Sequence, residues 1–420
     1  MQAFKITGGQ PLNGTIDIMG AKNAVLPLMA AALLTDESIV LNNVPFLSDV
    51  TNLIQLLNSF GCQIKQNTDS LTLRANTITN TTAAYEFVSK MRASFWVLGP
   101  LLSRFQQATV SLPGGCAIGA RPVDLYLMAL RQMGAKIDIQ NGYVIATGKL
   151  HGADIYFPKV SVGATHNTIM AAVLAKGITR IYNPAFEPEV MDLIALLKKM
   201  GANITGVGTK ILTIHGVSEL HGAEHTVVPD RIETATFAIA ASLTKGRIFM
   251  KNARLNLMES VAELLAPSQI LFTQEENGLW VDATNAHLKA VPVTTQEYPG
   301  FPTDVQAPMT ALLSLAKGES VVSERIFENR FMHVPELERM GANITQLNAH
   351  TILIKGVDHL SGAPVMASDL RGGVALVLAA LVASGETIVS RIYHIDRGYF
   401  ELEKKLTNLG ADIQRIQISS

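Results

Sequence analysis

A short motif, Gly-Ala-x-Ile, recurs along the chain and constrains its fold more than any other feature of the sequence. Four copies are intact, a fifth has Cys in place of Ala, and the sixth is degenerate; they occupy residues 134–137, 201–204, 341–344, 410–413, 61–64 and 267–270. The last residue of every copy is Ile, and successive isoleucines lie 66 to 74 residues apart. This period is longer than that of common solenoid repeats. Each repeat is therefore long enough to contain several strands and helices.

The motif marks a turn from a helix into a strand. Apolar residues recur at helical spacing before three of the copies: Leu53, Leu56, Leu57 and Phe60; Leu193, Leu196, Leu197 and Met200; Leu402, Leu406 and Leu409. The glycine that follows supplies the left-handed residue that commonly ends a helix, and the isoleucine begins a strand. We expect the apolar stripes to face sheets.

A second, more apolar helix is predicted upstream in each repeat, for example at residues 24–34, 168–175 and 375–383. A helix that is apolar on all sides belongs inside a domain. Because 420 residues exceed what one hydrophobic core usually holds, we expect two domains of about 200 residues. The predicted fold class is α/β: a two-domain inside-out α/β barrel built from six βα-type repeats, three per domain, with helices inside and sheets outside.

Charge and composition exclude several classes of partner. The 34 Lys and Arg nearly balance the 35 Asp and Glu, so no overall field attracts nucleic acid or an acidic membrane surface. The longest apolar runs, such as residues 374–383, are too short to span a bilayer. The first residues lack a signal-peptide pattern, and two cysteines fit a reducing compartment. We expect a cytoplasmic protein that binds any anion by local geometry.

Polar or charged residues begin the apolar helices. They are Lys22 and Asn23, Arg92, Ser161 to Gly163, Asp230 and Arg231, Thr303 and Asp304, and Asp369 to Arg371. Helix N-termini carry unpaired N–H groups and partial positive charge, so several of them together would bind a polyanion. The alternative is that Ser161, Asp230, Asp304 and Asp369 are ordinary N-caps. Capping does not explain the cations at this end of the helices.

A glycine-rich loop contains one of the two cysteines. Cys116 follows Gly114 and Gly115 and precedes Arg121 and Pro122, where a helix is expected to begin. A thiol beside an arginine and a helix N-terminus can act as a nucleophile or proton donor. Cys62, on a helix-to-strand turn, is expected to be buried and inert. Metal-ligand spacing, a P-loop and a dinucleotide-binding motif are absent from the sequence, so we expect no metal and no cofactor.

Several longer motifs together resemble one known family. They are Gly20-Ala-Lys-Asn23, Leu112 to Pro122, Lys159 to Thr165, Phe301-Pro-Thr-Asp304, Phe327-Glu-Asn-Arg-Phe331 and Arg391 to Tyr399. The chain resembles the UDP-N-acetylglucosamine 1-carboxyvinyltransferases, a family of enolpyruvyl transferases, from about residue 4 to about residue 416. The related shikimate-pathway enolpyruvyl transferases have a Gly-Ser-Lys-Ser type motif in place of Gly-Ala-Lys-Asn and lack the cysteine loop.

The resemblance implies transfer of the enolpyruvyl group of phosphoenolpyruvate to the 3-hydroxyl of UDP-N-acetylglucosamine. Phosphate is released by addition and elimination, in the first committed step of peptidoglycan synthesis. In this family Cys116 would donate a proton to the methylene carbon, and Asp304 would accept the hydroxyl proton. The resemblance assigns Lys22, Asn23, Arg121 and Arg397 to phosphoenolpyruvate, with Lys22 and Arg397 counted among the catalytic groups.

The same resemblance assigns a nucleotide-sugar site, with Asn23 also near the sugar. Its residues are Arg92, Trp96, Arg121, Pro122, Val123, Asp124, Leu125, Lys159, Val160, Ser161, Val162, Gly163, Asp304 and Ile326. Asp369 and Arg371 would support the site; the alternative for them is a helix cap and a structural ion pair.

The resemblance also implies a domain division. Residues 1–21 with 230–420 would form one domain and residues 22–229 the other, with the active-site cleft between them. The expected partners are the two small-molecule substrates, with no nucleic acid or membrane, and the expected state is a monomer. Two alternatives stay open: a shikimate-pathway transferase and a non-catalytic paralogue that binds a nucleotide sugar. The degenerate repeat at 267–270 departs from the family pattern and leaves its local turn in question.

Overall fold

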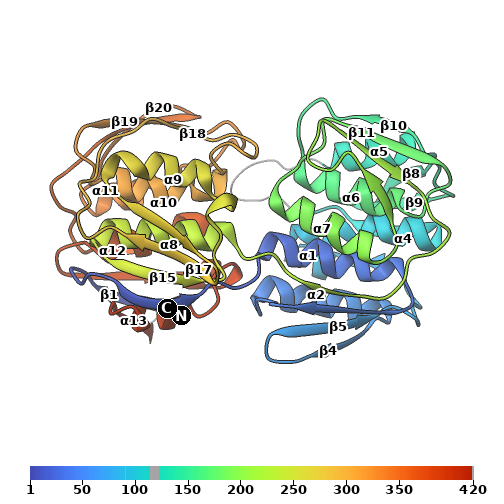
Figure 1. Ribbon diagram of the computed structural model, residues 1–420, viewed down its shortest axis with the longest axis horizontal. Helices are drawn as coiled ribbons and strands as arrows, with labels where there is room; N and C mark the ends of the chain where they lie inside the picture. The colour runs from blue at the N-terminus through green and yellow to red at the C-terminus, as the bar shows by residue number, and fades with distance from the viewer. Residues whose placement is uncertain (90, 114–122, 419–420) are drawn as a thin grey trace. The chain divides into compact units, whose positions relative to one another are not determined.

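The computed structural model describes residues 1–89, 91–113 and 123–418. The chain forms two compact units (Figure 1). Among the described residues, unit 1 contains 1–19 and 229–418, and unit 2 contains 20–89, 91–113 and 123–228. Within these ranges, no helix combines the length and the apolar character that crossing a membrane requires.

The described strands form six four-stranded sheets, three in each unit. In unit 2 the first sheet has the order β14 (Ala223–Thr226), β3 (Ser38–Asn42), β5 (Ser70–Arg74), β4 (Gln63–Gln66). The second has the order β6 (Thr82–Ala83), β7 (Gln107–Ser111), β9 (Tyr143–Thr147), β8 (Lys136–Gln140). The third has the order β10 (Asp154–Tyr156), β11 (Ile178–Tyr182), β13 (Ile211–His215), β12 (Asn203–Thr205). Those of unit 1 are β2 (Asn13–Asp17), β15 (Arg247–Lys251), β17 (Gly278–Asp282), β16 (Leu271–Glu275); β18 (Val293–Thr294), β19 (Glu319–Ser323), β21 (Thr351–Lys355), β20 (Asn343–Asn348); and β22 (Pro364–Met366), β23 (Glu386–Ser390), β1 (Gln2–Thr7), β24 (Asp412–Gln417).

All six sheets have the same strand directions. In the order given, the first strand is parallel to the second, and the remaining neighbours are antiparallel. The fold is therefore α/β with mixed sheets, and one structural repeat is used six times.

The sequence motif produces the last strand of each sheet: β4, β8, β12, β16, β20 and β24. The motif glycines adopt the predicted left-handed conformation, with φ between 95° and 103°. In the degenerate copy Gln269 takes this role with φ of 63°, and β16 begins two residues later at Leu271. The helix-to-strand turn is thus confirmed, and the sixth copy makes the same turn without a glycine.

The apolar helices are buried, as predicted, although several begin earlier than the apolar pattern indicated. In unit 1, α10 (Thr303–Leu313) packs against α8 (Arg231–Thr244) and α12 (Leu370–Ala380). In unit 2, α4 (Leu98–Phe105) packs against α6 (Val162–Ala172), and α1 (Lys22–Ala31) is buried along most of its length. Because these helices begin before their apolar runs, the polar and charged residues predicted at the helix starts lie in or beside the first helical turns.

The remaining helices include those with apolar stripes. They are α2 (Ser48–Phe60), α3 (Tyr85–Val88), α5 (Asp124–Gln132), α7 (Pro188–Lys199), α9 (Glu259–Leu265), α11 (Val334–Arg339) and α13 (Leu402–Asn408), with 3-10 turns η1 (Ala32–Leu34), η2 (Arg92–Val97), η3 (Leu255–Leu257), η4 (Ala266–Ser268) and η5 (Ile392–Arg397). Every residue of the three predicted stripes is buried. Burial of one face therefore fixes how these helices lie.

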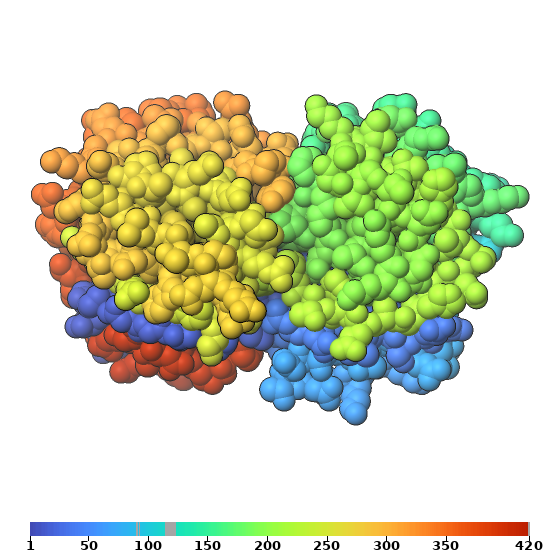
Figure 2. Space-filling model, viewed as in Figure 1, coloured from blue at the N-terminus to red at the C-terminus, as the bar shows by residue number. Residues whose placement is uncertain are grey.

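The two ends of the chain meet in unit 1. β1 lies antiparallel to β24, with Gln2 opposite Gln417. Figure 2 shows the blue N-terminal segment running beside the red C-terminal segment. Beyond β2, the chain passes into unit 2 near residue 20 and returns near residue 228. Backbone bonds tie these two connections together: Asp230 N–H donates to the Met19 carbonyl at 2.9 Å, and Ala21 N–H to the Val228 carbonyl at 2.7 Å.

Candidate active site

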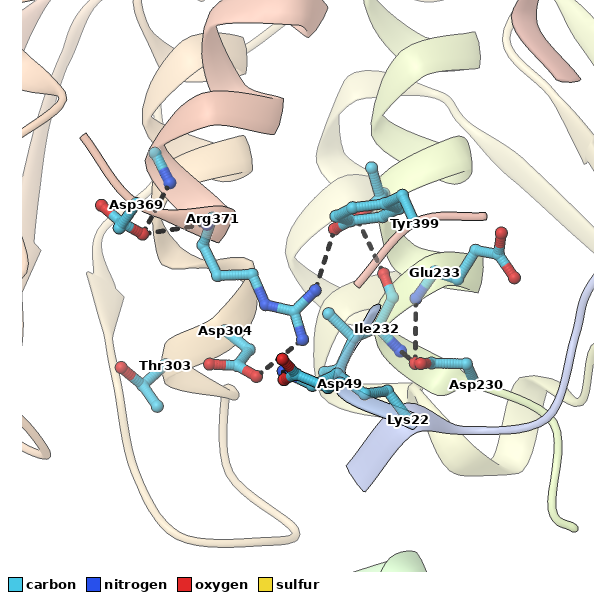
Figure 3. Close-up of polar contacts among 12 residues, drawn as sticks. Lys22, Asp49, Asp230, Ile232, Glu233, Thr303, Asp304, Asp369, Arg371 and Tyr399 are labelled. Atoms are coloured by element: carbon cyan, nitrogen blue, oxygen red, sulfur yellow. Dashed lines mark hydrogen bonds and ion pairs between the residues drawn. The ribbon is translucent and has the colours of Figure 1, made fainter. Parts of the chain in front are cut away.

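Asp304 lies in the first turn of α10 and is held by two arginines of unit 1. Arg330 Nη2 donates to Asp304 Oδ1. Arg371 Nη2 donates to Asp304 Oδ2 at 2.9 Å (Figure 3). Both arginine side chains are buried. Two guanidinium groups in contact with one carboxylate stabilise its negative charge, and such bonds are short and directional. The carboxylate of Asp304 is thus fixed in place, and its side chain remains about one-quarter exposed.

The structure corrects the interpretation of Asp304 as an N-cap. The N-cap of α10 is Pro302, whose side chain makes no capping bond, and Asp304 is the second residue of the helix. The same interpretation is confirmed for Ser161, Asp230 and Asp369, whose side chains accept bonds from backbone N–H groups of α6, α8 and α12. Asp304 differs because its carboxylate bonds to side chains from other segments.

Arg371 connects Asp304 to a buried hydroxyl pair. Its Nη1 donates to Tyr399 Oη at 3.1 Å (Figure 3). Tyr399 Oη in turn lies 2.8 Å from Thr236 Oγ1. Burial is the largest single effect and would lower the pKa of Arg371. The electrostatic effects of Asp304, Tyr399 and Asp230, with the hydrogen bond to Asp304, together outweigh it and leave that pKa raised. The pKa of Tyr399 is raised too, because burial disfavours the phenolate. Arg371 therefore stays charged and Tyr399 stays a neutral phenol.

Replacing Tyr399 by Phe should destabilise unit 1. The substitution removes a hydroxyl that is buried and leaves one Arg371 N–H and the Thr236 hydroxyl without this partner. An unsatisfied buried polar group costs about 1–3 kcal/mol, so the urea midpoint should fall clearly below that of the wild type. Tyr393→Phe is the matched control because Tyr393 is exposed, and it should leave the midpoint unchanged. Equal midpoints for both variants would contradict this account.

Lys22 begins α1 and pairs with an acid of the next helix. Its Nζ lies 2.9 Å from Oδ2 of Asp49, which is in the first turn of α2 and is buried. Asn23 is the second residue of α1. Asp49 could not be recognised from the sequence, because an acid in a first helical turn also has an ordinary electrostatic explanation. The ion pair with Asp49 holds the ammonium group of Lys22 in place within unit 2.

The N-terminus of α6 lies among aromatic groups from α5 and η2. A Cβ atom on Gly163 would lie 1.8 Å from Tyr126 Oη and 3.3 Å from Trp96 Nε1, so only glycine fits. The structure thus brings Trp96 close to Gly163, beside Ser161 and Val162, and α5 contacts α6. Ser161 Oγ accepts from Ala164 N–H at 3.3 Å.

The other predicted residues are placed as follows. Val123, Asp124 and Leu125 precede or begin α5; Lys159 and Val160 precede α6; Ile326 follows β19; and Arg397 ends η5. Cys116, Arg121 and Pro122 lie outside the described residues, and Arg92 is described only as the first backbone residue of η2. The described α5 begins at Asp124, later than the expected start at Pro122.

A buried histidine supports Trp96. His166 lies in α6, and its ring meets the Trp96 ring edge to face, with the ring centroids 5.2 Å apart. The Nε2 atom of His166 lies 3.3 Å from the carbonyl oxygen of Glu189. Burial lowers the pKa of His166 from 6.5 to about 4. The folded protein therefore holds this ring neutral at pH 7.

Stability should consequently decline in acid through His166. The unfolded chain takes up a proton below its pKa of 6.5 whereas the folded chain resists until about pH 4, so stability is full above 6.5 and falls as pH drops toward 4. At pH 5 this one group would cost about 2 kcal/mol. The urea midpoint of His166→Gln should fall less between pH 7 and pH 5 than that of the wild type. His287→Gln, at an exposed histidine, should keep the wild-type pH dependence.

Comparison with known proteins places the whole chain in one family. Residues 6–406 match the family model described as EPSP synthase (3-phosphoshikimate 1-carboxyvinyltransferase). Proteins named UDP-N-acetylglucosamine 1-carboxyvinyltransferase from Rhodopseudomonas palustris and Paramagnetospirillum magneticum are 53% identical to this chain; each alignment covers 99% of this chain, and 100% and 99% of those proteins respectively.

Solved structures give the fold. The enolpyruvyl transferase NikO from Streptomyces tendae superposes with a TM-score of 0.91 at 24% identity, covering 100% of this chain and 99% of that one. EPSP synthase from Acinetobacter baumannii has a TM-score of 0.79 at 17% identity, with 99% and 100% coverage. The fold is that of the enolpyruvyl transferases, and the chain belongs to the UDP-N-acetylglucosamine 1-carboxyvinyltransferase family.

Proposed function

We propose that the chain transfers the enolpyruvyl group of phosphoenolpyruvate to the 3-hydroxyl of UDP-N-acetylglucosamine and releases phosphate. The observation that carries this function is 53% identity over essentially the full length to proteins named for that activity. The product commits the sugar nucleotide to peptidoglycan synthesis.

The proposed reaction is an addition followed by an elimination. The sugar oxygen bonds to C2 of phosphoenolpyruvate as a proton adds to the methylene carbon. The C2–O bond to phosphate then breaks, and the new methyl group loses a proton to restore the double bond. No atom changes its net oxidation state over the two steps, so no redox cofactor is required. Cys116 would supply the proton in the addition, and Asp304 would accept the proton of the sugar hydroxyl.

The contacts of Asp304 support its proposed role. Arg330 and Arg371 bond to different oxygens of its carboxylate, so the group is both charged and oriented. A general base must hold its lone pairs in a fixed direction within hydrogen-bond reach of the proton that it accepts. Arg371 is in turn held by Tyr399, which makes Arg371 a positioning residue for Asp304.

Phosphoenolpyruvate would be held by Lys22, Asn23, Arg121 and Arg397. An ammonium group has three donors, so Lys22 can keep its bond to Asp49 and still bind a phosphate or carboxylate oxygen. Arginine adds planar, two-pronged donors that match the same oxygens. Lys22 and Asn23 belong to unit 2, and Arg397 belongs to unit 1.

The nucleotide sugar would use the N-terminus of α6. Ser161 caps one N–H, and the partial positive charge of the helix end would face the diphosphate. Trp96 and Gly163 lie beside it, and Lys159, Val160 and Val162 belong to the same segment. Arg92, Arg121 to Leu125, Asp304 and Ile326 complete the proposed set, with Asp369 acting through its cap on α12.

We further infer that each unit has its sheets outside and its apolar helices inside, in an inside-out α/β barrel. Nearly complete burial of α8, α10 and α12 supports this arrangement in unit 1. The enzyme would act as a cytoplasmic monomer on its two small-molecule substrates.

Mass spectrometry of the reaction product tests the proposal. Incubation with both substrates should yield UDP-N-acetylglucosamine that carries one added enolpyruvyl group. Shikimate 3-phosphate in place of the sugar nucleotide should yield no product; the match to the EPSP synthase model makes it the necessary control. If phosphoenolpyruvate gave a product with shikimate 3-phosphate but not with UDP-N-acetylglucosamine, the chain would be a shikimate-pathway enolpyruvyl transferase. Binding of the sugar nucleotide without any product would indicate a non-catalytic protein.

A further inference from the structure

A buried carboxylate without a signal in the sequence is connected to Asp304 through hydrogen bonds. Glu324 follows β19 and has an exposed fraction of 1%. Its Oε1 accepts bonds from Thr295 Oγ1 at 2.9 Å and from the backbone N–H groups of Ile326 at 2.8 Å and Phe327 at 3.1 Å. Its Oε2 accepts a bond from Thr303 Oγ1 at 2.9 Å. Four donors therefore converge on one carboxylate.

These bonds hold three separate segments of unit 1. Thr295 follows β18 and also accepts from the Arg325 N–H at 2.8 Å. Ile326 belongs to the segment after β19, and Thr303 is the first residue of α10. One side chain thus fixes the start of α10 relative to the segment that carries Ile326.

A continuous chain of bonds leads from Glu324 to Asp304. Thr303 donates its hydroxyl hydrogen to Glu324 and accepts a bond from Arg330 Nε at 3.3 Å. Arg330 then donates through Nη2 to Asp304. The direction of each bond is set, because a carboxylate only accepts and a guanidinium only donates. The Thr303 hydroxyl is therefore oriented with its hydrogen toward Glu324 and a lone pair toward Arg330.

A contribution to folding stability does not by itself explain why a charged carboxylate is buried at Glu324. Taking a carboxylate out of water is costly, and bonds to neutral hydroxyl and amide donors only offset that cost. The charge of Glu324 instead fixes the orientation of the Thr303 hydroxyl, which is connected to Asp304, and of the backbone at Ile326.

We infer that Glu324 is a positioning residue for the reaction. It orients Thr303, and through Thr303 it sets Arg330 and the carboxylate of Asp304; it also shapes the backbone at Ile326 and Phe327. The inference rests on the proposed function, because it assigns Glu324 a part in aligning the sugar hydroxyl with its base. This bonded chain runs through Glu324, Thr303, Arg330 and Asp304, whereas the four groups proposed for phosphoenolpyruvate are Lys22, Asn23, Arg121 and Arg397.

Steady-state kinetics of Glu324→Gln test the inference. A small displacement of a reacting group costs up to about 100-fold in rate, so kcat should fall about 10- to 100-fold. The KM for phosphoenolpyruvate should stay near the wild-type value. Glu319→Gln is the control: Glu319 lies on β19, is exposed and pairs with Lys355, and its loss should change neither constant.

Two substitutions of Thr303 keep the test decisive if Glu324→Gln folds poorly. Thr303→Ser retains the hydroxyl and loses a methyl group, whereas Thr303→Val retains the shape and loses the hydroxyl. The inference requires kcat near wild type for Ser and a fall similar to that of Glu324→Gln for Val. A merely structural role would instead make kcat independent of which group is lost, with only the urea midpoints differing.

The outcomes separate the inference from the function on which it rests. A wild-type protein that forms no product from the two substrates refutes the proposed function, and the inference with it. An active wild type with fully active, folded Glu324→Gln or Thr303→Val refutes the inference alone.

Discussion

Replacement of Asp304 by Asn is expected to lower kcat about 10²- to 10⁴-fold, the usual contribution of a general base. The amide has nearly the shape of the carboxylate but no basic lone pair for the sugar proton. It also places an NH₂ group against Arg330 or Arg371, where two donors would meet. Turnover should therefore be lost even when both substrates are saturating.

Folding must be measured alongside activity, because the substitution leaves two buried guanidinium groups with a neutral partner. Loss of one member of a buried ion pair can cost about 3–5 kcal/mol. Circular dichroism and calorimetric binding of UDP-N-acetylglucosamine would establish that the variant is folded. Asp282→Asn, at a partly exposed aspartate paired with Arg247, is the matched control and should retain full activity. A folded Asp304→Asn enzyme with near wild-type kcat would return Asp304 to a structural role.

Cys116→Ala should lose nearly all turnover, again by about 10²- to 10⁴-fold, because the methylene carbon would lack its proton donor. Cys116→Asp should retain activity, since a carboxylic acid can also donate a proton and the proposed chemistry does not require a lasting bond to sulfur. Steady-state kcat of the two variants separates proton donation from nucleophilic attack. Full activity of the Ala variant would remove this assignment.

A small epoxide that carries a phosphonate group provides an independent readout at Cys116. It should alkylate Cys116 in the wild type, and UDP-N-acetylglucosamine should speed the labelling. Cys62 is the internal control: it is buried, and burial raises the pKa of its thiol to about 11, so little thiolate forms. Peptide mapping that placed the label on Cys62 would contradict the proposed role of Cys116.

The repeated turns could be predicted because their signals are local. A helix end is specified by a glycine together with the apolar residues just before it, so no distant residue is needed. This signal located the last strand of five sheets. In the sixth repeat Gln269 adopts the same left-handed backbone without a glycine, so only the spacing of the repeat indicated the turn. The burial of the apolar helices followed from their composition in the same way.

The partners of Asp304 could not be predicted in this manner. Arg330 and Arg371 are 26 and 67 residues away along the chain, and the sequence gives no periodic signal for such pairs. An aspartate near a helix start has the same local pattern as a cap, which is why the capping interpretation held for Asp369 and failed for Asp304. Glu324 was missed for a related reason: nothing next to it in sequence indicates that a carboxylate there is buried.

Release of inorganic phosphate is the most direct test of the central claim, that the chain is an enolpyruvyl transferase acting on UDP-N-acetylglucosamine. Phosphate should appear continuously only when phosphoenolpyruvate and UDP-N-acetylglucosamine are both present. Omitting either substrate, or replacing the sugar nucleotide by shikimate 3-phosphate, should reduce release to the level without enzyme. Phosphate release that does not depend on UDP-N-acetylglucosamine, or its absence with both substrates and folded protein, would contradict the account.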